Sequence, residues 1–459
     1  MNYLQLNKMT GTVLLCGFIG IIATLIYNDT LVMDTWEHLR ATYLVILGNI
    51  PYRDFFEHHH PMLWYTFAPI MQIFPKNAIM IFYIARIFAL LCSMGTLYFI
   101  YKIIINFFEG KENFIPFLLI LLTFFPVWYV VSAFKPEAVA YLFYFVGLYF
   151  CFEYVKTSCR KNLVLCGIAF VMAFLFIQTM IFNVIFVGVA INAVCYKRQV
   201  FIKDLFYAAS VPLLLLLSLG IIVYRCDLWQ LYFQLNWLYN TKIRIFDTLA
   251  IWNWTLQIFI AFWAAYSLIR QTNSVYIKII SFLLIGEILL IFSFHKAHPH
   301  YLFLAFIYAS VLIGCYLQKL SYQTLKIPVY AFLIGSLLIN YLTIFVKNNR
   351  LIMMEYQIIN QSEQNAVRNI YPYISTIYGH RFSYYEMFSM DMVAVDTCNF
   401  NRFPDYSLES DIKKNQYTYL VYDDTTDYLH PLCLKEKFKV SPNVLTNYSR
   451  ISKDLWKHK

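Results

Sequence analysis

The chain has 459 residues, of which 60% are hydrophobic, 19% aromatic and only 14% charged. Soluble domains carry about 25% charged residues, so the composition excludes a wholly water-soluble protein. Several apolar runs reach the ~20 residues that a helix needs to cross a bilayer. The formal net charge of +10 requires no nucleic-acid partner, because the basic residues lie mostly in short segments between apolar runs. The composition predicts an all-α polytopic membrane protein.

The first apolar run, residues 11–27, follows Lys8 and shows no small-residue cleavage site before Asp29. A secretory signal peptide would carry such a site, so we expect a retained helix. By the positive-inside rule, Lys8 predicts a cytoplasmic N-terminus. The segment 28–76 is then expected on the outer side of the membrane.

Ten further spans are expected, which gives 11 in all. The stretch 162–196 has a polar break at Gln178-Thr179 and suits two short helices packed back to back. The predicted spans are 77–101, 114–131, 138–154, the two halves of 162–196, 205–224, 251–269, 275–294, 301–317 and 327–346. Basic clusters fall at nearly every turn predicted to be cytoplasmic, which supports this count. Residues 225–247 are expected to form a polar outer segment.

The composition changes after the last span. Residues 1–346 are predicted to form the transmembrane catalytic module, and 347–459 a small α/β extracytoplasmic domain. This domain is expected to contain an amphipathic helix at 356–371 and a buried strand at 417–422. Of the ten cysteines, only Cys398 and Cys433 lie in a polar region, where they could form a disulfide outside the cytoplasm.

The polar stretch from Asp34 to Tyr65 stands out between the first two spans, and we interpret it as an active-site loop. It contains the acids Asp34, Glu37, Asp54 and Glu57 and the histidines His38, His58, His59 and His60. Consecutive residues cannot all face one site, so at most two of the three adjacent histidines are expected to function. His59 is interpreted as a polar cap.

Two other segments are predicted on the same outer face. One is the turn that holds His295, His298 and His300, and the other is Lys135-Pro136-Glu137. Acids, imidazoles and a lysine gathered there could bind an anionic headgroup, a divalent metal ion, or both. Arg86 and Glu287 lie inside predicted spans at similar depth, and buried charges of this kind are usually paired or functional. No nucleotide-binding signature is present.

These motifs resemble those of the GT-C glycosyltransferases. The resemblance rests on Asp34 after the first span, on Gly48-Asn49-Ile50-Pro51-Tyr52-Arg53-Asp54-Phe55, and on His60-Pro61. Lys135-Pro136-Glu137 is similar to the Arg-Pro-Asp of bacterial members, and His298-Pro299-His300-Tyr301 to their His/Tyr motif. The types that the chain resembles are the protein O-mannosyltransferases, the lipid A aminoarabinose transferase and bacterial lipopolysaccharide-core transferases.

The resemblance implies a polyprenyl-phosphate sugar donor, a lipid, glycan or protein acceptor, and inversion by direct displacement at the outer face of a bacterial inner membrane. Asp34 and Glu57 would be catalytic, with Asp34 as the general base. The expected substrate-binding residues are Glu37, His58, His60, Lys135, Glu137, His298, His300, Tyr301 and Arg86. Asp34, Glu137 and His58 are the candidates to hold a divalent metal ion.

Two other functions remain open from the sequence. A transporter or flippase of a lipid-linked saccharide would show inverted repeats and charges at mid-membrane depth. An O-antigen polymerase or ligase would concentrate its key residues in a large loop late in the chain. Here the acids and histidines gather early, which favours the transferase.

Overall fold

The structure is a computed structural model. It describes residues 33–54, 57, 59–73, 78–108, 114–122, 133–195, 201–239, 245–246, 248–294, 296–297, 302–319, 370–371, 419–421, 441–452 and 455–459. The chain divides into two compact units. Unit 1 comprises Met1–Leu25, Phe88–Ser132 and Pro136–Ile344, and unit 2 comprises Ile26–Ile87, Ala133–Lys135 and Phe345–Lys459.

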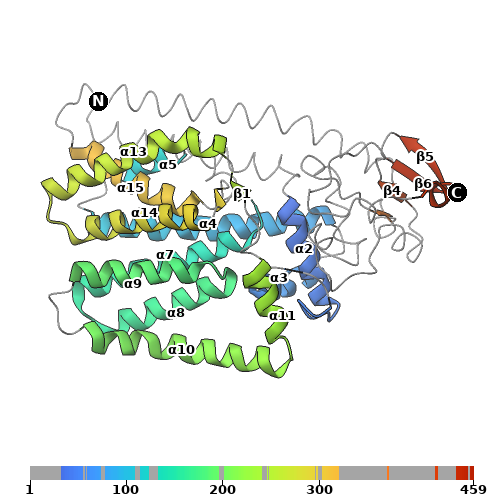
Figure 1. Cartoon of the computed structure of the whole chain (residues 1–459), viewed down its shortest axis with the longest axis horizontal. Helices are drawn as coiled ribbons and strands as arrows, with labels where there is room; N and C mark the ends of the chain where they lie inside the picture. The colour runs from blue at the N-terminus through green and yellow to red at the C-terminus, as the bar shows by residue number, and fades with distance from the viewer. Residues whose placement is uncertain are drawn as a thin grey trace. The chain divides into compact units, whose positions relative to one another are not determined.

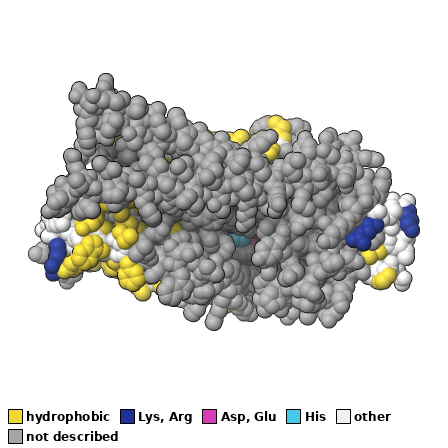
Figure 2. Space-filling model, turned by 90° about the horizontal axis from the view of Figure 1, so that it is seen from above, with side chains coloured by type: hydrophobic (Ala, Val, Ile, Leu, Met, Phe, Trp, Pro, Cys, Tyr) yellow, Lys and Arg dark blue, Asp and Glu magenta, His cyan; other side chains and the backbone are white. Residues whose placement is uncertain are grey.

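The described part of the chain is mostly helical (Figure 1). The helices are α2 (Met33–Ile46), α3 (Met62–Ile73), α4 (Ala78–Phe107), α5 (Phe114–Leu122), α7 (Pro136–Thr157), α8 (Arg160–Phe176), α9 (Met180–Cys195), α10 (Phe201–Arg225), α11 (Trp229–Phe233), the π-helix η2 (Gln234–Tyr239), α13 (Thr248–Gln271), α14 (Val275–Phe294) and α15 (Phe303–Lys319). Many large hydrophobic side chains are exposed on these helices, and Figure 2 shows such side chains gathered in a surface patch. Exposed apolar patches of this kind suit helices that contact lipid.

Among the described residues, three helical stretches are long and apolar enough to cross a membrane: Met80–Phe107, Pro136–Thr157 and Val275–Ser293. A fourth would be the pair Pro212–Arg225 and Trp229–Leu238, which is bent by 118°. The predicted polytopic helical architecture is therefore confirmed. The total of 11 spans stays a prediction, because the runs 11–27 and 327–346 lie outside the described residues.

The predicted break at Gln178 is confirmed. Helix α8 ends at Phe176 and α9 begins at Met180, and the Gln178 side chain between them donates a hydrogen bond to the backbone oxygen of Asn236 (3.3 Å). Within the predicted outer segment 225–247, α11 and η2 form helical structure as far as Tyr239, and the side of the membrane on which it lies stays a prediction. Trp229 in α11 is 55% exposed, as suits a residue type that is favoured at membrane interfaces.

The carboxylate of Asp204 ties three helices together at one end of the bundle. It accepts a hydrogen bond from the Tyr154 hydroxyl of α7 (2.8 Å) and another from Nε of Arg160 in α8 (2.7 Å), while Asp204 itself lies in the first turn of α10. The hydrogen bond from Tyr154, followed by the hydrogen bond and charge of Arg160, holds the pKa of Asp204 below its ordinary value. The ionised carboxylate therefore stabilises the packing of α7, α8 and α10.

Asp204→Asn is expected to lower the melting temperature of the purified protein at neutral pH. A carboxyl group whose pKa is lowered by folding stabilises the folded state above its ordinary pKa, and this contribution disappears as the pH falls through the folded-state pKa. The difference in melting temperature between wild type and Asp204→Asn should therefore be constant near neutrality and shrink below the ordinary pKa of 3.8. A difference that is unchanged at low pH would contradict this role.

The buried carboxylate of Glu287 in α14 has a neutral partner. Nδ2 of Asn183 in α9 donates a hydrogen bond to Oε1 of Glu287. Tyr144 of α7 and Tyr308 of α15 both interact electrostatically with Glu287. Their hydroxyl oxygens lie 2.6 Å apart and share a hydrogen bond. Polar groups from four helices thus meet inside unit 1.

The stretch predicted as an active-site loop contains two helices that pack against each other, α2 and α3. Helix α2 shows no apolar stripe, because much of its buried side is polar, including Thr35, Glu37 and His38. Helical periodicity is normally detected from apolar residues. The sequence therefore predicted a loop where α2 forms. The described residues between the two helices, 47–54, 57 and 59–61, belong to neither helix.

The C-terminal region contains a four-stranded sheet in the order β3-β4-β6-β5. The strands are β3 (Ile370–Tyr371), β4 (Tyr419–Val421), β5 (Tyr448–Ser452) and β6 (Leu455–His458), and a short helix, α19 (Pro442–Leu445), precedes β5. Strand β4 confirms the strand predicted at 417–422. The helix predicted at 356–371 is wrong at its end, because β3 pairs in parallel with β4 there. Cys398 and Cys433 lie outside the described residues.

Candidate functional site

The loop between α2 and α3 begins with a helix cap that requires glycine. Gly48 has φ +88°, a conformation that glycine adopts without a steric penalty. Its N–H donates to the Val45 carbonyl oxygen, and the N–H of Asn49 donates to that of Leu44, both at 3.0 Å. These two bonds form a Schellman motif. The glycine therefore ends α2 and turns the chain back toward α3.

Tyr52 holds the returning loop in place. It is buried and has φ +71°, a left-handed conformation that costs an L residue roughly 1–2 kcal/mol. Its hydroxyl donates a hydrogen bond to the backbone oxygen of His59 (2.7 Å). Asp54 has a local role, since it is exposed and accepts hydrogen bonds from the Ile50 N–H and the Arg53 guanidinium. The strained tyrosine thus fixes the position of His59.

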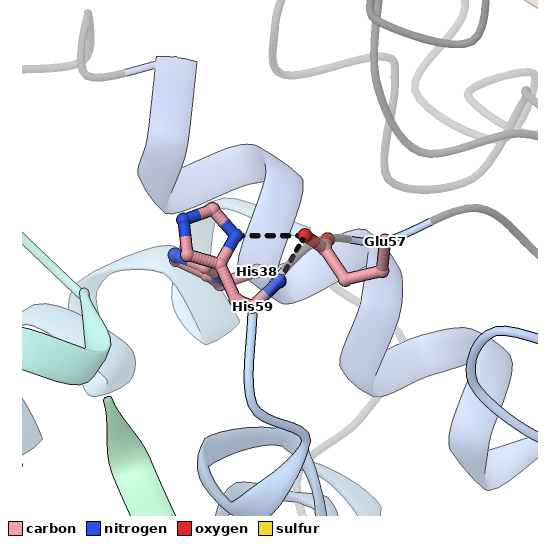
Figure 3. A group of neighbouring side chains, drawn as sticks. All are labelled: His38, Glu57 and His59. Carbon is pink, nitrogen blue, oxygen red and sulfur yellow. Dashed lines mark hydrogen bonds and ion pairs between the residues drawn. The ribbon is translucent and has the colours of Figure 1, made fainter. Parts of the chain in front are cut away.

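Glu57 and His59 form a close carboxylate–imidazole pair (Figure 3). Oε1 of Glu57 lies 2.7 Å from Nδ1 of His59 and also accepts the His59 backbone N–H at 3.3 Å. Glu57 is fully buried, whereas the His59 side chain is 29% exposed. An ionised carboxylate at this distance favours a proton on Nδ1 and stabilises the protonated imidazole.

His38 completes the cluster from α2. Its ring packs edge-on against the His59 ring, with centroids 4.9 Å apart. Nε1 of Trp64 in α3 lies 3.2 Å from Nδ1 of His38 and donates a hydrogen bond to it. Indole nitrogen can only donate, so Nδ1 of His38 is the acceptor and a neutral His38 carries its proton on Nε2. A neutral His38 can therefore donate a hydrogen bond only through Nε2.

The group His38, Glu57 and His59 has the composition of a metal site, with potential ligand atoms all within 4.8 Å of one another. Its hydrogen bonds argue against that use. Coordination through Nδ1 of His38 would break the bond from Trp64, and coordination through Nε2 would place a proton on Nδ1, facing the indole N–H. The arrangement fits a hydrogen-bonded proton network better than a metal centre.

A segment from far along the chain joins this cluster. The backbone N–H of Phe134 donates to Oγ1 of Thr35 (3.1 Å), and its ring packs on that of Phe67 in α3 with centroids 4.6 Å apart. Thr35 directly follows Asp34, and Phe134 directly precedes Lys135, which is only 3% exposed. Asp34, the predicted base, and Lys135, the predicted phosphate-binding residue, are thus the chain neighbours of the two residues that this hydrogen bond joins.

The remaining predicted site residues are placed as follows. Asp34 lies in the first turn of α2, with its side chain outside the described part of the chain. Glu37 and His60 are buried, and so is Arg86, whose guanidinium lies 5.2 Å from the centre of the Phe82 ring. Glu137 is half-buried in the first turn of α7, where the helix dipole favours a carboxylate. The residues outside the described part are His58, His298, His300 and Tyr301.

The structure describes two residues next to the predicted histidine turn, Lys296 and Ala297. Strand β2 (Lys296–Ala297) pairs in parallel with β1 (Ile245–Phe246). This brings Ile245 and Phe246, before α13, beside Lys296 and Ala297, which follow α14. Both segments belong to unit 1.

The sequence did not indicate the role of one cluster residue, His59, or of two residues that contact the cluster or the Lys135 segment, Trp64 and Thr35. His59 was interpreted as a polar cap, whereas it pairs with Glu57. Trp64 and Thr35 were not singled out. Trp64 donates a hydrogen bond to His38, and Thr35 accepts one from Phe134, next to Lys135. The nearest signal in the sequence was Pro51, because proline presets the backbone of a turn, but it identifies none of these three residues.

Comparison with known proteins bears on the fold. The sequence pattern of the family described as Dolichyl-phosphate-mannose-protein mannosyltransferase (PMT_2) matches residues 58–222. The crystal structure of ArnT from Cupriavidus metallidurans bound to undecaprenyl phosphate superposes with a TM-score of 0.55 at 14% identity, covering 84% of this chain and 75% of ArnT. The apo structure of the same ArnT gives 0.51 and 14%, covering 68% and 61%. No curated protein matches the sequence.

These matches confirm the predicted resemblance to GT-C transferases at the level of fold. The family pattern begins after Glu57, so it covers neither Asp34 nor the buried residues of α2. The roles of the residues in the cluster therefore rest on the geometry of this chain.

Proposed function

We propose that this chain is a membrane glycosyltransferase that moves a sugar from a polyprenyl-phosphate donor to an acceptor hydroxyl. The observation that carries the proposal is the buried polar cluster of α2 and α3, joined to the Lys135 segment, in a chain with the ArnT fold. Burying so many charged and polar groups is costly unless they are paired or used. Their position on an ArnT-like scaffold supports a catalytic use.

The chemistry follows from the residue types. An acceptor oxygen attacks the anomeric carbon of the donor while the bond from that carbon to the phosphate oxygen breaks. The acceptor proton passes to a carboxylate, assigned to Asp34, and the bonding electron pair leaves on the phosphate. Attack opposite the leaving group inverts the anomeric centre. General-base assistance of this kind contributes typically 10²–10⁴-fold to a rate.

Cationic groups stabilise the departing phosphate. Lys135 is the first candidate, because its segment is bonded to the residue next to Asp34. His298, His300 and Tyr301 are proposed to assist it, and His58, His60, Glu37 and Arg86 to contact substrate. Glu57 orients His59 and stabilises its charged form, so that the imidazole supplies a second positive group. Glu137 is proposed to support the base.

The ArnT structure in the comparison holds undecaprenyl phosphate, which supports a polyprenyl-phosphate donor here. The proposed location is a bacterial inner membrane, with the site facing the periplasm, as the basic clusters predict. The acceptor would be a lipid, a glycan or a protein.

The proposal is tested by incubating purified protein with a panel of polyprenyl-phosphate sugars and extracted acceptor lipid. Transfer from at least one donor is the expected result. If no donor supports transfer, but proteoliposomes move an intact lipid-linked saccharide across the bilayer, the transporter function is correct instead. Polymerisation of repeat units would indicate a polymerase or ligase.

A further inference from the structure

Four helices of unit 1 enclose an apolar cavity far in sequence from the α2–α3 cluster. Its volume is about 280 Å³, close to the lower end of the range for ligand pockets, ~300–1,000 Å³. Helices α7, α8, α9 and α10 line it, and they run side by side in Figure 1. Representative lining residues are Cys151, Cys166, Phe170, Ile191 and Leu216. Every lining residue is apolar, so the cavity suits a hydrocarbon ligand.

The cavity is an elongated slot. The α8 residues that line it extend from Leu163 to Phe174, and those of α9 from Ile181 to Ile191. At a rise of 1.5 Å per residue these stretches are about 15–17 Å long. The hydrocarbon core of a bilayer is ~30 Å thick, so the slot is about as long as one leaflet is deep. That length matches one lipid chain.

The slot opens to the surface that contacts lipid. Ala209 at its edge is exposed, and the neighbouring Ile185 and Leu213 are 53% and 56% exposed. Inside, Gly188 leaves space that a side chain would fill, because a Cβ built there meets no atom within 4 Å. A chain from the bilayer can therefore enter sideways between α9 and α10.

One end of the slot is basic. Leu163 lies close to the turn between α7 and α8, where Lys156, Arg160 and Lys161 are exposed. The charge of Arg160 is balanced by Asp204, and Glu153 lies one turn before Lys156 in α7, so the three basic residues still outnumber the two acids. Basic residues next to a membrane attract anionic headgroups. By the positive-inside rule this end is cytoplasmic.

We propose that the slot holds one acyl chain of an anionic phospholipid from the leaflet at the α7–α8 turn, with its headgroup beside Lys156 and Lys161. The site uses none of the residues assigned to sugar transfer. It is therefore independent of the proposed function and can be tested without a transfer assay.

The test compares wild type with Gly188→Leu, which fills the slot, and with Gly220→Leu as a matched control. A Cβ at Gly220 also meets no atom within 4 Å, but this residue does not line the slot. Each protein is exchanged into bilayers of phosphatidylglycerol and phosphatidylethanolamine, and the retained lipids are counted by native mass spectrometry. Wild type and Gly220→Leu should retain one phosphatidylglycerol per chain. Gly188→Leu should retain about tenfold less phosphatidylglycerol, because the leucine side chain takes the space in which the acyl chain would make apolar contacts.

Two further measurements keep the proposal falsifiable if Gly188→Leu folds poorly. Phosphatidylglycerol with a photoreactive group on its acyl chain should label peptides of α8 and α9 in the wild type. Replacing Lys156 and Lys161 by Gln should abolish the preference for phosphatidylglycerol over phosphatidylethanolamine. Equal retention by a folded Gly188→Leu, labelling elsewhere only, or capture of polyprenyl phosphate in place of phospholipid would overturn the proposal.

Discussion

Asp34→Asn is expected to reduce sugar transfer by about 10³-fold while leaving the donor bound. The substitution replaces one oxygen by an amide nitrogen, so it keeps the volume of the side chain and removes its ability to accept the acceptor proton. Loss of a general base typically costs 10²–10⁴ in rate. The measurement is the turnover number with the best polyprenyl-phosphate donor, together with donor affinity measured separately.

Asp54→Asn is the matched control for this experiment. Asp54 lies in the same polar stretch, but it is exposed and accepts hydrogen bonds from Ile50 and Arg53 in its own turn. Its amide can still accept a hydrogen bond from Ile50, so activity should remain within about twofold of wild type. Full activity in Asp34→Asn would exclude Asp34 as the base and transfer that role to Glu57 or Glu137.

Glu57→Gln is expected to reduce turnover by about 10- to 100-fold. The amide keeps the volume of this fully buried side chain, but it removes the negative charge 2.7 Å from Nδ1 of His59. Carboxylates that orient metal-bound imidazoles contribute about 10- to 100-fold, and we expect a comparable effect on the imidazole of His59. Turnover and substrate affinity are measured separately, because a change confined to affinity would indicate a binding role.

Glu57→Asp provides the comparison that separates charge from packing. It retains the carboxylate in a shorter side chain, so it should recover part of the activity lost in Glu57→Gln. If both variants are equally impaired and both melt earlier than wild type, Glu57 serves the fold and the charge-based account is incorrect.

The membrane helices were predictable because their signal is local. Apolar length alone located α14 at its observed bounds, and a polar pair inside one long apolar run located the break at Gln178. The helix α2 was not predictable in this way, because residues such as Glu37 and His38 occupy its buried side. A search that expects only apolar residues on the buried side of a helix predicts a loop for such a segment.

The composition of the cluster was partly predictable, but its pairing was not. Acids and histidines in one polar stretch indicated a site, and Lys135 was expected to reach it. The role of His59 depends on the left-handed Tyr52 and its hydrogen bond across the loop. The approach of Phe134 to Thr35 joins residues 99 positions apart. Neither contact has a signature in residue type or spacing.

The central claim is tested most directly by determining the products of a single reaction with wild-type protein. The polyprenyl phosphate released and the acceptor glycosylated would be quantified together, and the anomeric configuration of the product read by NMR. The account predicts one polyprenyl phosphate released per sugar transferred, with inverted configuration. Retained configuration, or an acceptor left unglycosylated while the donor stays intact, would contradict it.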